Sequence, residues 1–118
     1  MINGPTQAPT VDPELADMRL IEIFLPLSNN SGTRFADQYY RDVRKTLTNK
    51  FGGLTAFTRS PAEGTEKAQG TERSDELIVF EVMVEKIDRD WWLDYRGELE
   101  AKFQQDRILI RASNVAVL

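Results

Sequence analysis

Hydrophobic residues recur along the chain with two different spacings, and each spacing predicts one kind of element. Over residues 35–51 and again over residues 88–105 an apolar side chain returns at every fourth position, which places these side chains on one face of a helix. The predicted stripes are Phe35, Tyr39, Val43, Leu47 and Phe51 in the first helix, and Trp91, Tyr95, Leu99 and Phe103 in the second. Both segments are therefore expected to be amphipathic helices that pack on a common core.

The ends of both segments carry residues suited to begin or end a helix. Thr33 or Asp37 could open the first helix, and the glycine pair at 52–53 closes it, because glycine readily adopts the left-handed conformation after a helix. Asp88 is a suitable N-cap for the second helix. Gly97 lies inside that helix at a cost of about 1 kcal/mol relative to alanine, and the sequence offers no reason for it.

Four β-prone runs complete the pattern and give the element order β-α-β-β-α-β. They cover residues 18–27, 54–59, 76–84 and 107–112. The polar 15-residue stretch 60–74 is expected to be a mobile loop. Residues 1–17 contain three prolines and no periodicity, which predicts a disordered N-terminal arm. The chain is thus expected to be this arm followed by one domain over residues 18–118.

The two helical segments also resemble each other, which indicates an internal repeat. A shift of 52 residues aligns charged as well as apolar positions, among them Asp42 with Asp94, Lys50 with Lys102, Phe51 with Phe103 and Arg59 with Arg111. Two similar βαβ halves predict an α+β fold, the ferredoxin-like βαββαβ sandwich. In this fold a four-stranded antiparallel sheet of order 4-1-3-2 carries both helices on one face.

Strand alternation then assigns the side chains of the sheet to two faces. The predicted helix-facing residues are Ile21, Ile23, Leu25, Ala56, Thr58, Ile78, Phe80, Val82, Ile108 and Ile110. The predicted open face carries Leu20, Glu22, Phe24, Thr55, Phe57, Arg59, Val79, Glu81, Met83, Leu109 and Arg111. No helix is left to cover this second face, and it is too apolar to stay exposed. A homodimer formed through the open face is therefore expected.

Two acids and two bases on the open face are the candidate chemistry. In the expected strand order Arg111 neighbours Glu22, and Arg59 neighbours Glu81. One interpretation is cross-strand ion pairs in a sheet covered by a partner. The other is an anion site or an acid/base pair in a cleft. With the apolar neighbours, the candidate ligand-binding residues are Glu22, Phe24, Phe57, Arg59, Glu81, Met83 and Arg111.

Composition narrows the possible chemistry. The absence of cysteine and histidine excludes disulfides, thiolate nucleophiles, Cys- or His-bound zinc and every Ser-His relay. No metal or cofactor is expected, and a general base would have to be Asp, Glu, Lys or Tyr. The net charge of −4 argues against nucleic-acid and membrane-surface partners. The longest apolar run, residues 20–27, is too short to span a bilayer, and without a signal peptide the expected location is the cytoplasm.

Several motifs resemble those of an uncharacterised family of small bacterial proteins. They are FGGLTAFTRSPAEG at residues 51–64, FEVMV at 80–84, the Trp91-Trp92 pair, Tyr95-Arg96 and Phe103-Gln104. The family commonly has an aromatic residue after the SPAxG turn, where this chain has Thr65 and Glu66. The resemblance implies an architecture of the dimeric α/β barrel type, in which two open sheets face each other. Proteins of that type include cofactor-independent monooxygenases, stress-response proteins and ligand-binding modules.

Two functions of different classes remain open from the sequence. The first is a non-catalytic homodimeric module that binds a small ligand near the open sheet face. The alternative is a small cofactor-independent dimeric enzyme, monooxygenase- or isomerase-like, with Glu22 or Glu81 as base and Arg59 or Arg111 holding an enolate or carboxylate. An apolar cavity around an unpaired carboxylate would favour the enzyme, whereas charges paired in a dry interface would favour the module.

Overall fold

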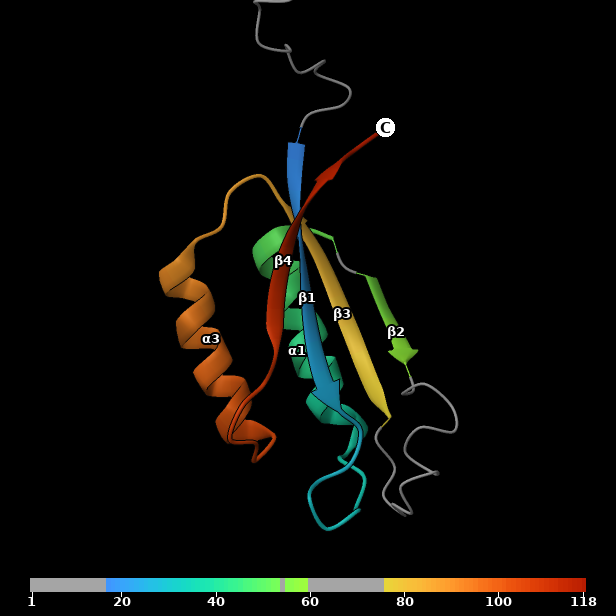
Figure 1. Cartoon of the computed structure of the whole chain (residues 1–118). Coiled ribbons are helices and arrows are strands. Elements are labelled where there is room, and N and C mark those ends of the chain that lie inside the picture. The colour runs from blue at the N-terminus through green and yellow to red at the C-terminus, as the bar shows by residue number, and fades with distance from the viewer. Residues whose placement is uncertain (1–16, 54, 60–75) are drawn as a thin grey trace, which may run out of the picture.

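The computed structural model describes residues 17–53, 55–59 and 76–118. Its elements in chain order are β1 (Asp17–Pro26), α1 (Asp37–Phe51), β2 (Thr55–Arg59), β3 (Leu77–Val84), α3 (Arg89–Lys102) and β4 (Ile110–Ala116) (Figure 1). The α+β class, with two helices and an antiparallel sheet, is confirmed. The first strand begins at Asp17, one residue earlier than expected. The rest of the predicted arm and the predicted loop 60–74 lie outside the described residues.

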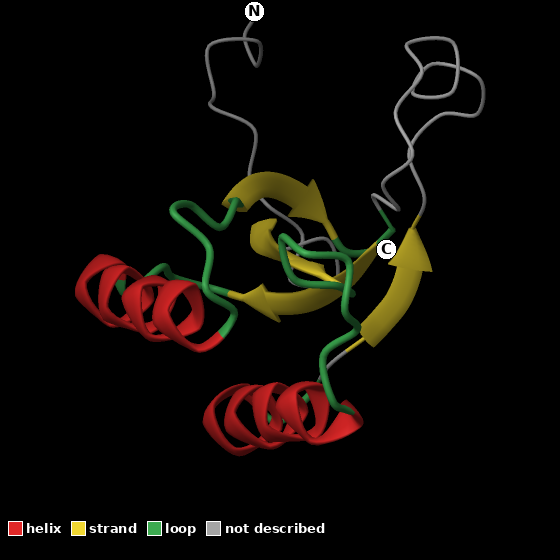
Figure 2. Ribbon diagram, turned by 90° about the horizontal axis from the view of Figure 1, so that it is seen from below, coloured by secondary structure: helices red, strands yellow, loops and turns green. Residues whose placement is uncertain are grey.

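Strand β1 is the central strand of the sheet. It pairs antiparallel with β3 from Arg19 opposite Val84 to Pro26 opposite Leu77. On its other edge it pairs antiparallel with β4, and the backbone of β2 pairs with the outer edge of β3, so that the order is β2-β3-β1-β4. Both helices lie on the same face of this sheet (Figure 2). Helix α1 lies behind the middle strands and α3 lies beside β4 (Figure 1).

The hydrophobic core fills the space between the helices and the sheet. Alternate residues of β1 and β3 point toward the helices, and their side chains meet those of both helices. The buried members are Ile21, Ile23, Leu25, Val43, Leu47, Phe80, Val82, Val84, Trp92, Tyr95, Leu99, Phe103 and Ile108. Ile78 and Ile110 pack against this cluster half-buried. The predicted helix-facing set is confirmed at these strand positions, while the side chains of Ala56 and Thr58 lie outside the described residues.

Of the two residues expected to open α1, the structure has Asp37 as the first residue of the helix and places Thr33 outside it. The helix begins at Asp37, and its N-cap is Ala36, whose side chain accepts no hydrogen bond. Thr33 belongs to the preceding turn instead, where its backbone N–H donates to Asn29 Oδ1 at 2.9 Å. At the other end Gly52 has φ of 82° and its N–H donates to the Thr48 carbonyl at 2.7 Å, which confirms the predicted glycine stop.

Helix α3 starts as predicted and ends earlier. The Asp88 carboxylate accepts the backbone N–H of Trp91 at 3.2 Å, as expected of an N-cap. The helix ends at Lys102, and two residues later Gln104 has a positive φ of 55°, which is incompatible with continued helix. The final strand covers Ile110–Ala116 rather than 107–112, because the first residues of β1 offer backbone partners as far as Ala116.

Aromatic contacts between the helices occur in two corresponding sets. Phe51, at the end of α1, lies 5.3 Å from Trp91 and 5.4 Å from Trp92 between ring centroids. Phe103, just after α3, lies 5.5 Å from both Tyr39 and Tyr40. These are the positions that the shift of 52 residues relates. The contacts between the halves therefore follow the predicted repeat.

A lysine near the end of each helix also contacts an aromatic ring of the other helix. The Lys50 ammonium lies 5.2 Å above the Trp91 ring, and the Lys102 ammonium lies 5.2 Å above the Tyr39 ring. Such cation–π contacts link each helix to the other.

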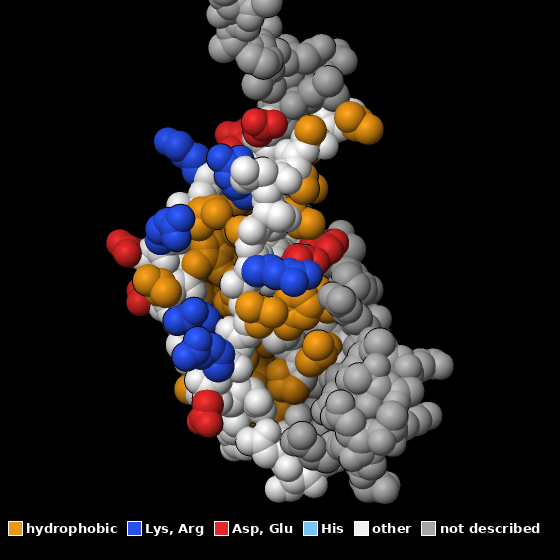
Figure 3. Space-filling model, in the orientation of Figure 1, with side chains coloured by type: hydrophobic (Ala, Val, Ile, Leu, Met, Phe, Trp, Pro, Cys, Tyr) orange, Lys and Arg blue, Asp and Glu red, His pale blue; other side chains and the backbone are white. Residues whose placement is uncertain are grey.

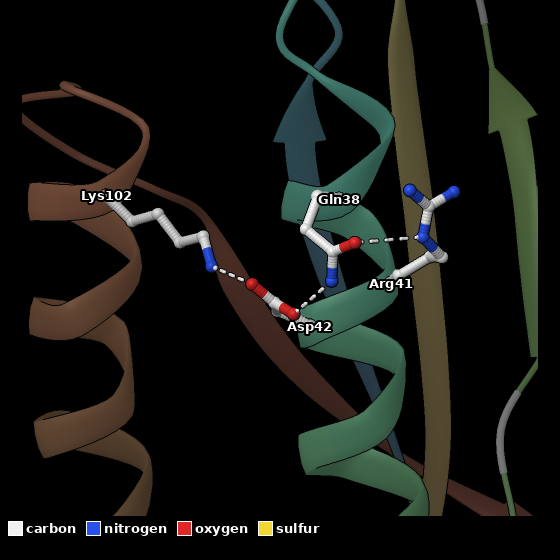
Figure 4. Close-up of polar contacts among 4 residues, drawn as sticks. All are labelled: Gln38, Arg41, Asp42 and Lys102. Carbon is white, nitrogen blue, oxygen red and sulfur yellow. Dashed lines mark hydrogen bonds and ion pairs between the residues drawn. The ribbon is translucent and has the colours of Figure 1, made fainter.

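One polar link between the helices has no counterpart in the repeat. Lys102 Nζ donates to Asp42 Oδ2 at 3.0 Å, Gln38 donates to Asp42 Oδ1 at 2.7 Å, and Arg41 donates to Gln38 (Figure 4). The Gln38 hydrogen bond, and then that of Lys102, lower the pKa of the Asp42 carboxyl below its ordinary value. The equivalent pair, Asp94 with Lys50, forms no ion pair among the described residues.

Candidate functional site

The sheet face opposite the helices carries the predicted Glu22–Arg111 contact. The two residues lie opposite each other on β1 and β4, and Arg111 Nε donates to Glu22 Oε1 at 2.8 Å. Glu22 is largely covered, with 16% of its side chain exposed, whereas 54% of the Arg111 side chain is exposed. Glu22 is thus held by a specific cation that remains accessible to a second anion.

The prediction that Arg59 neighbours Glu81 across the strands is wrong in register. In the register of β2 and β3, Thr55 lies opposite Glu81 and Arg59 lies opposite Leu77. Leu77 and Glu81 are four residues apart on β3, which is about 13 Å along a strand. The edge strands also have different bounds in the two halves, since residues 52–54 connect α1 to β2 and residues 103–109 connect α3 to β4. The repeat therefore does not extend with a constant shift into the edge strands.

A second consequence of the register is that Glu81 lies opposite Glu22. Like charges on directly opposed positions of an antiparallel pair destabilise it. One row across the sheet thus reads Thr55, Glu81, Glu22, Arg111, with a cation at one end only.

The apolar residues of this face are covered to very different extents. Val79 is fully buried, and Phe24 is 9% exposed with the Arg111 guanidinium 4.9 Å from its ring centroid. Met83 and Leu109 are 46% and 51% exposed. Figure 3 shows hydrophobic side chains on this face around a group of positive and negative ones. The expectation that this face is uncovered is therefore corrected for Val79 and Phe24, which are buried within the single chain.

The two remaining predicted site residues belong to β2. The register places Phe57 opposite Val79 and Arg59 opposite Leu77, and their side chains lie outside the described residues.

The structure also contains a groove that the sequence analysis did not anticipate. It has a volume of about 500 Å³ and lies between α3 and the strands β1 and β4. Its lining consists of Arg19, Ile21, Ile87, Arg89, Trp92, Leu93, Arg96, Ile110, Arg111, Ala112 and Asn114. Four of these residues are arginines and none is acidic, although the whole chain has a net charge of −4.

A signal for this groove is present in the sequence. Arg89, Trp92, Leu93 and Arg96 have the spacing i, i+3, i+4, i+7, which places them on one face of α3. That face lies next to the core stripe of Trp91, Tyr95 and Leu99. This pattern, two arginines on either side of two apolar residues on one helix face, indicates a surface that is both apolar and positively charged.

Two tyrosines that composition left as possible bases are unsuited to that role. Burial raises the pKa of Tyr40 to about 12, and its hydroxyl donates to the Pro26 carbonyl at 2.6 Å. Burial also raises the pKa of Tyr95 to about 12. Both hydroxyls therefore stay protonated at neutral pH.

Within residues 17–53 and 76–118, no three His, Cys, Asp or Glu side chains are grouped so that they could hold a metal ion. No helix in the described part of the chain is long and apolar enough to cross a membrane.

Comparison with known proteins gives no relative for this chain: no family model, no curated protein and no solved structure matches it. The resemblance to the bacterial family therefore remains a prediction.

Proposed function

We propose that the chain is a ferredoxin-like, non-catalytic binding module that forms a homodimer through the sheet face opposite its helices. The strand order β2-β3-β1-β4 with both helices on one face supports the ferredoxin-like assignment. In the dimer the two sheets meet in the manner of a dimeric α/β barrel, and a small ligand could be enclosed between them.

The observation that carries this proposal is the pair of exposed apolar side chains on that face. Met83 and Leu109 leave about half of their surface in water; Met83 lies on β3, and Leu109 immediately precedes β4. Burying such surface is favourable by about 25 cal/mol per Å². A second copy of the chain is the partner that presents the same surface in return.

Charge supports the same arrangement. Glu81 lies opposite Glu22, and Arg111 serves only one end of this row. In a two-fold dimer each patch faces its own copy, so Arg111 of one chain can approach Glu81 of the other. The exposed Arg111 side chain would then hold one carboxylate of each chain.

The enzyme alternative has less support from the described residues. Its first candidate base, Glu22, already accepts a hydrogen bond from Arg111 at 2.8 Å through Oε1. Its other candidate, Glu81, lines neither the groove beside α3 nor the smaller cavity between the helices.

The test is the oligomeric state in analytical ultracentrifugation at tens of micromolar chain. The wild type is expected to sediment as a dimer, and Met83→Glu or Leu109→Glu as a monomer. Both side chains are half-exposed, so the substitutions should leave the fold intact, as circular dichroism would verify. Leu93→Glu is the matched control, because Leu93 is 57% exposed on α3, away from the sheet face. A monomeric wild type, or dimeric variants at Met83 and Leu109, would overturn the proposal.

A further inference from the structure

We infer that the groove between α3 and β4 binds an organic anion with an apolar body and a carboxylate or phosphate head. This inference goes beyond the proposed dimer, since the groove lies between α3 and the sheet and shares Arg111 with the opposite face. Its volume of about 500 Å³ is within the range of pockets that hold small organic ligands.

The floor of the groove is apolar and the cations are placed around it. Ile21 and Trp92 are almost fully buried, and Ile110 is half-buried beside them. Figure 3 shows positive side chains beside the hydrophobic ones between α3 and the strands. The apolar floor favours a ligand that has an apolar part to bury against it. One without a negative charge would leave the arginines without a counter-charge.

The arginines are not evenly distributed along the groove. Arg19 lies opposite Val84, the end of β3, and residues 85–88 lead from there directly to Arg89. These two arginines therefore belong to the same end of the groove. Arg96 is seven residues further along α3, about 10 Å away at 1.5 Å per residue.

Three guanidinium groups retain capacity for a ligand. Arg89 is exposed and has no ion-pair partner among the described residues. Within the part of the chain that the structure describes, Arg19 donates to the neighbouring Met18 carbonyl alone, at 3.4 Å. Arg96 lies 3.6 Å from Glu100, and Glu100 also accepts the backbone N–H of Ile108. The fourth arginine, Arg111, already donates to Glu22.

This arrangement predicts the orientation of the ligand. Its head group lies between Arg19 and Arg89, because a guanidinium fork matches the two oxygens of a carboxylate or phosphate. Its apolar body lies over Ile21, Trp92 and Ile110 toward Arg96.

The test is competition with a fluorescent probe of matching chemistry. Anilinonaphthalene sulfonate, an aromatic body with one anionic head, should bind the folded protein with increased emission. Octanoate and octyl phosphate should displace it and octanol should not, and the more potent of the two anions identifies the preferred head group. Displacement should weaken with added salt.

Arg89→Gln and Arg96→Gln are the informative variants, and Arg107→Gln is the matched control. Arg107 is an exposed arginine outside the groove, so its loss changes the net charge equally. Loss of a hydrogen bond to a charged group lowers affinity by about tenfold or more. This loss is expected for Arg89→Gln, with a smaller one for Arg96→Gln and none for the control.

Three results would overturn the inference: no displacement by either anion, equal displacement by octanol, or equal affinity in Arg89→Gln and wild type. The dimer variant Met83→Glu should bind the anion as the wild type does. A failed dimer with intact anion binding, or the reverse, therefore separates the two proposals.

Discussion

The two halves of the molecule are alike where their helices meet and different where each helix meets the sheet. Between the helices, Phe51 and Phe103 make corresponding contacts with the aromatic pairs of the opposite half. Toward the sheet, the repeat relates Tyr40 and Arg44 of α1 to Trp92 and Arg96 of α3. These positions have similar side chains but different surroundings.

In the first half the two side chains are engaged with the sheet. The Tyr40 hydroxyl donates to the Pro26 carbonyl, and the Arg44 guanidinium lies 5.6 Å from the centroid of the Phe80 ring. In the second half Trp92 and Arg96 line the groove. The inner surface of each helix thus supports the common core, and the sheet side of α3 also borders the groove.

The largest effect is expected for the equivalent leucines of the two helices. Leu47 and Leu99 are 0% and 2% exposed and are related by the repeat. Leu47→Ala and Leu99→Ala should each lower the free energy of unfolding by about 2–5 kcal/mol, because each leaves a cavity in the core. Chemical denaturation with a constant m-value measures both. A loss below about 0.5 kcal/mol at Leu99 alone would contradict the likeness of the two halves and mean that α3 is turned differently.

A smaller effect of opposite sign is expected at Gly97. A Cβ added there would meet no atom within 4 Å, and the residue is exposed within α3. Gly97→Ala should therefore stabilise the protein by about 0.5–1 kcal/mol through helix propensity. The equivalent residue of α1 is Lys45, and Lys45→Ala is the control, with little change expected. Destabilisation by Gly97→Ala would indicate that something beyond the described contacts lies against this position.

The smallest effect is expected for the polar link between the helices. Asp42→Asn should lower the melting temperature at neutral pH slightly more than Asp94→Asn, its equivalent in the repeat, because only Asp42 is bonded to Lys102. The folded-state pKa of Asp42 lies below the ordinary value of 3.8. Its contribution is therefore present above that pH and is lost as the pH falls through the folded-state pKa. Thermal melts of both variants from neutral to acid pH measure this, and equal losses at neutral pH would contradict it.

The inner parts of this fold could be predicted from the sequence because they are periodic. The apolar stripes that contain Leu47 on α1 and Leu99 on α3 each repeat every four residues. The alternation of apolar residues at Ile21, Ile23 and Leu25 assigns each side chain of β1 to one face of the sheet. The Glu22–Arg111 contact followed from strand order and alternation together. Each of these depends on local spacing, which the sequence displays directly.

The edge strands and the groove depend on distances between elements, which the spacing of residues along the chain does not give. The register of Arg59 depends on how β2 aligns with β3, and the length of β4 depends on the partners that β1 offers at its start. The groove depends on how far α3 stands from β4, which no periodicity encodes. Its arginines are visible in the sequence, but the cavity that brings them together is a tertiary property.

The exchange of phenylalanines between the halves has a consequence for how the chain unfolds. Phe51 finds its aromatic neighbours on α3, and Phe103 finds its neighbours on and next to α1. If α3 detaches from the sheet, Phe51 loses its packing at the same moment, and the detachment of α1 exposes Phe103 in the same way. The free energy to open either helix therefore includes part of the free energy that holds the other. The amide hydrogens of α1 and α3 should exchange through one shared cooperative opening rather than through two independent ones.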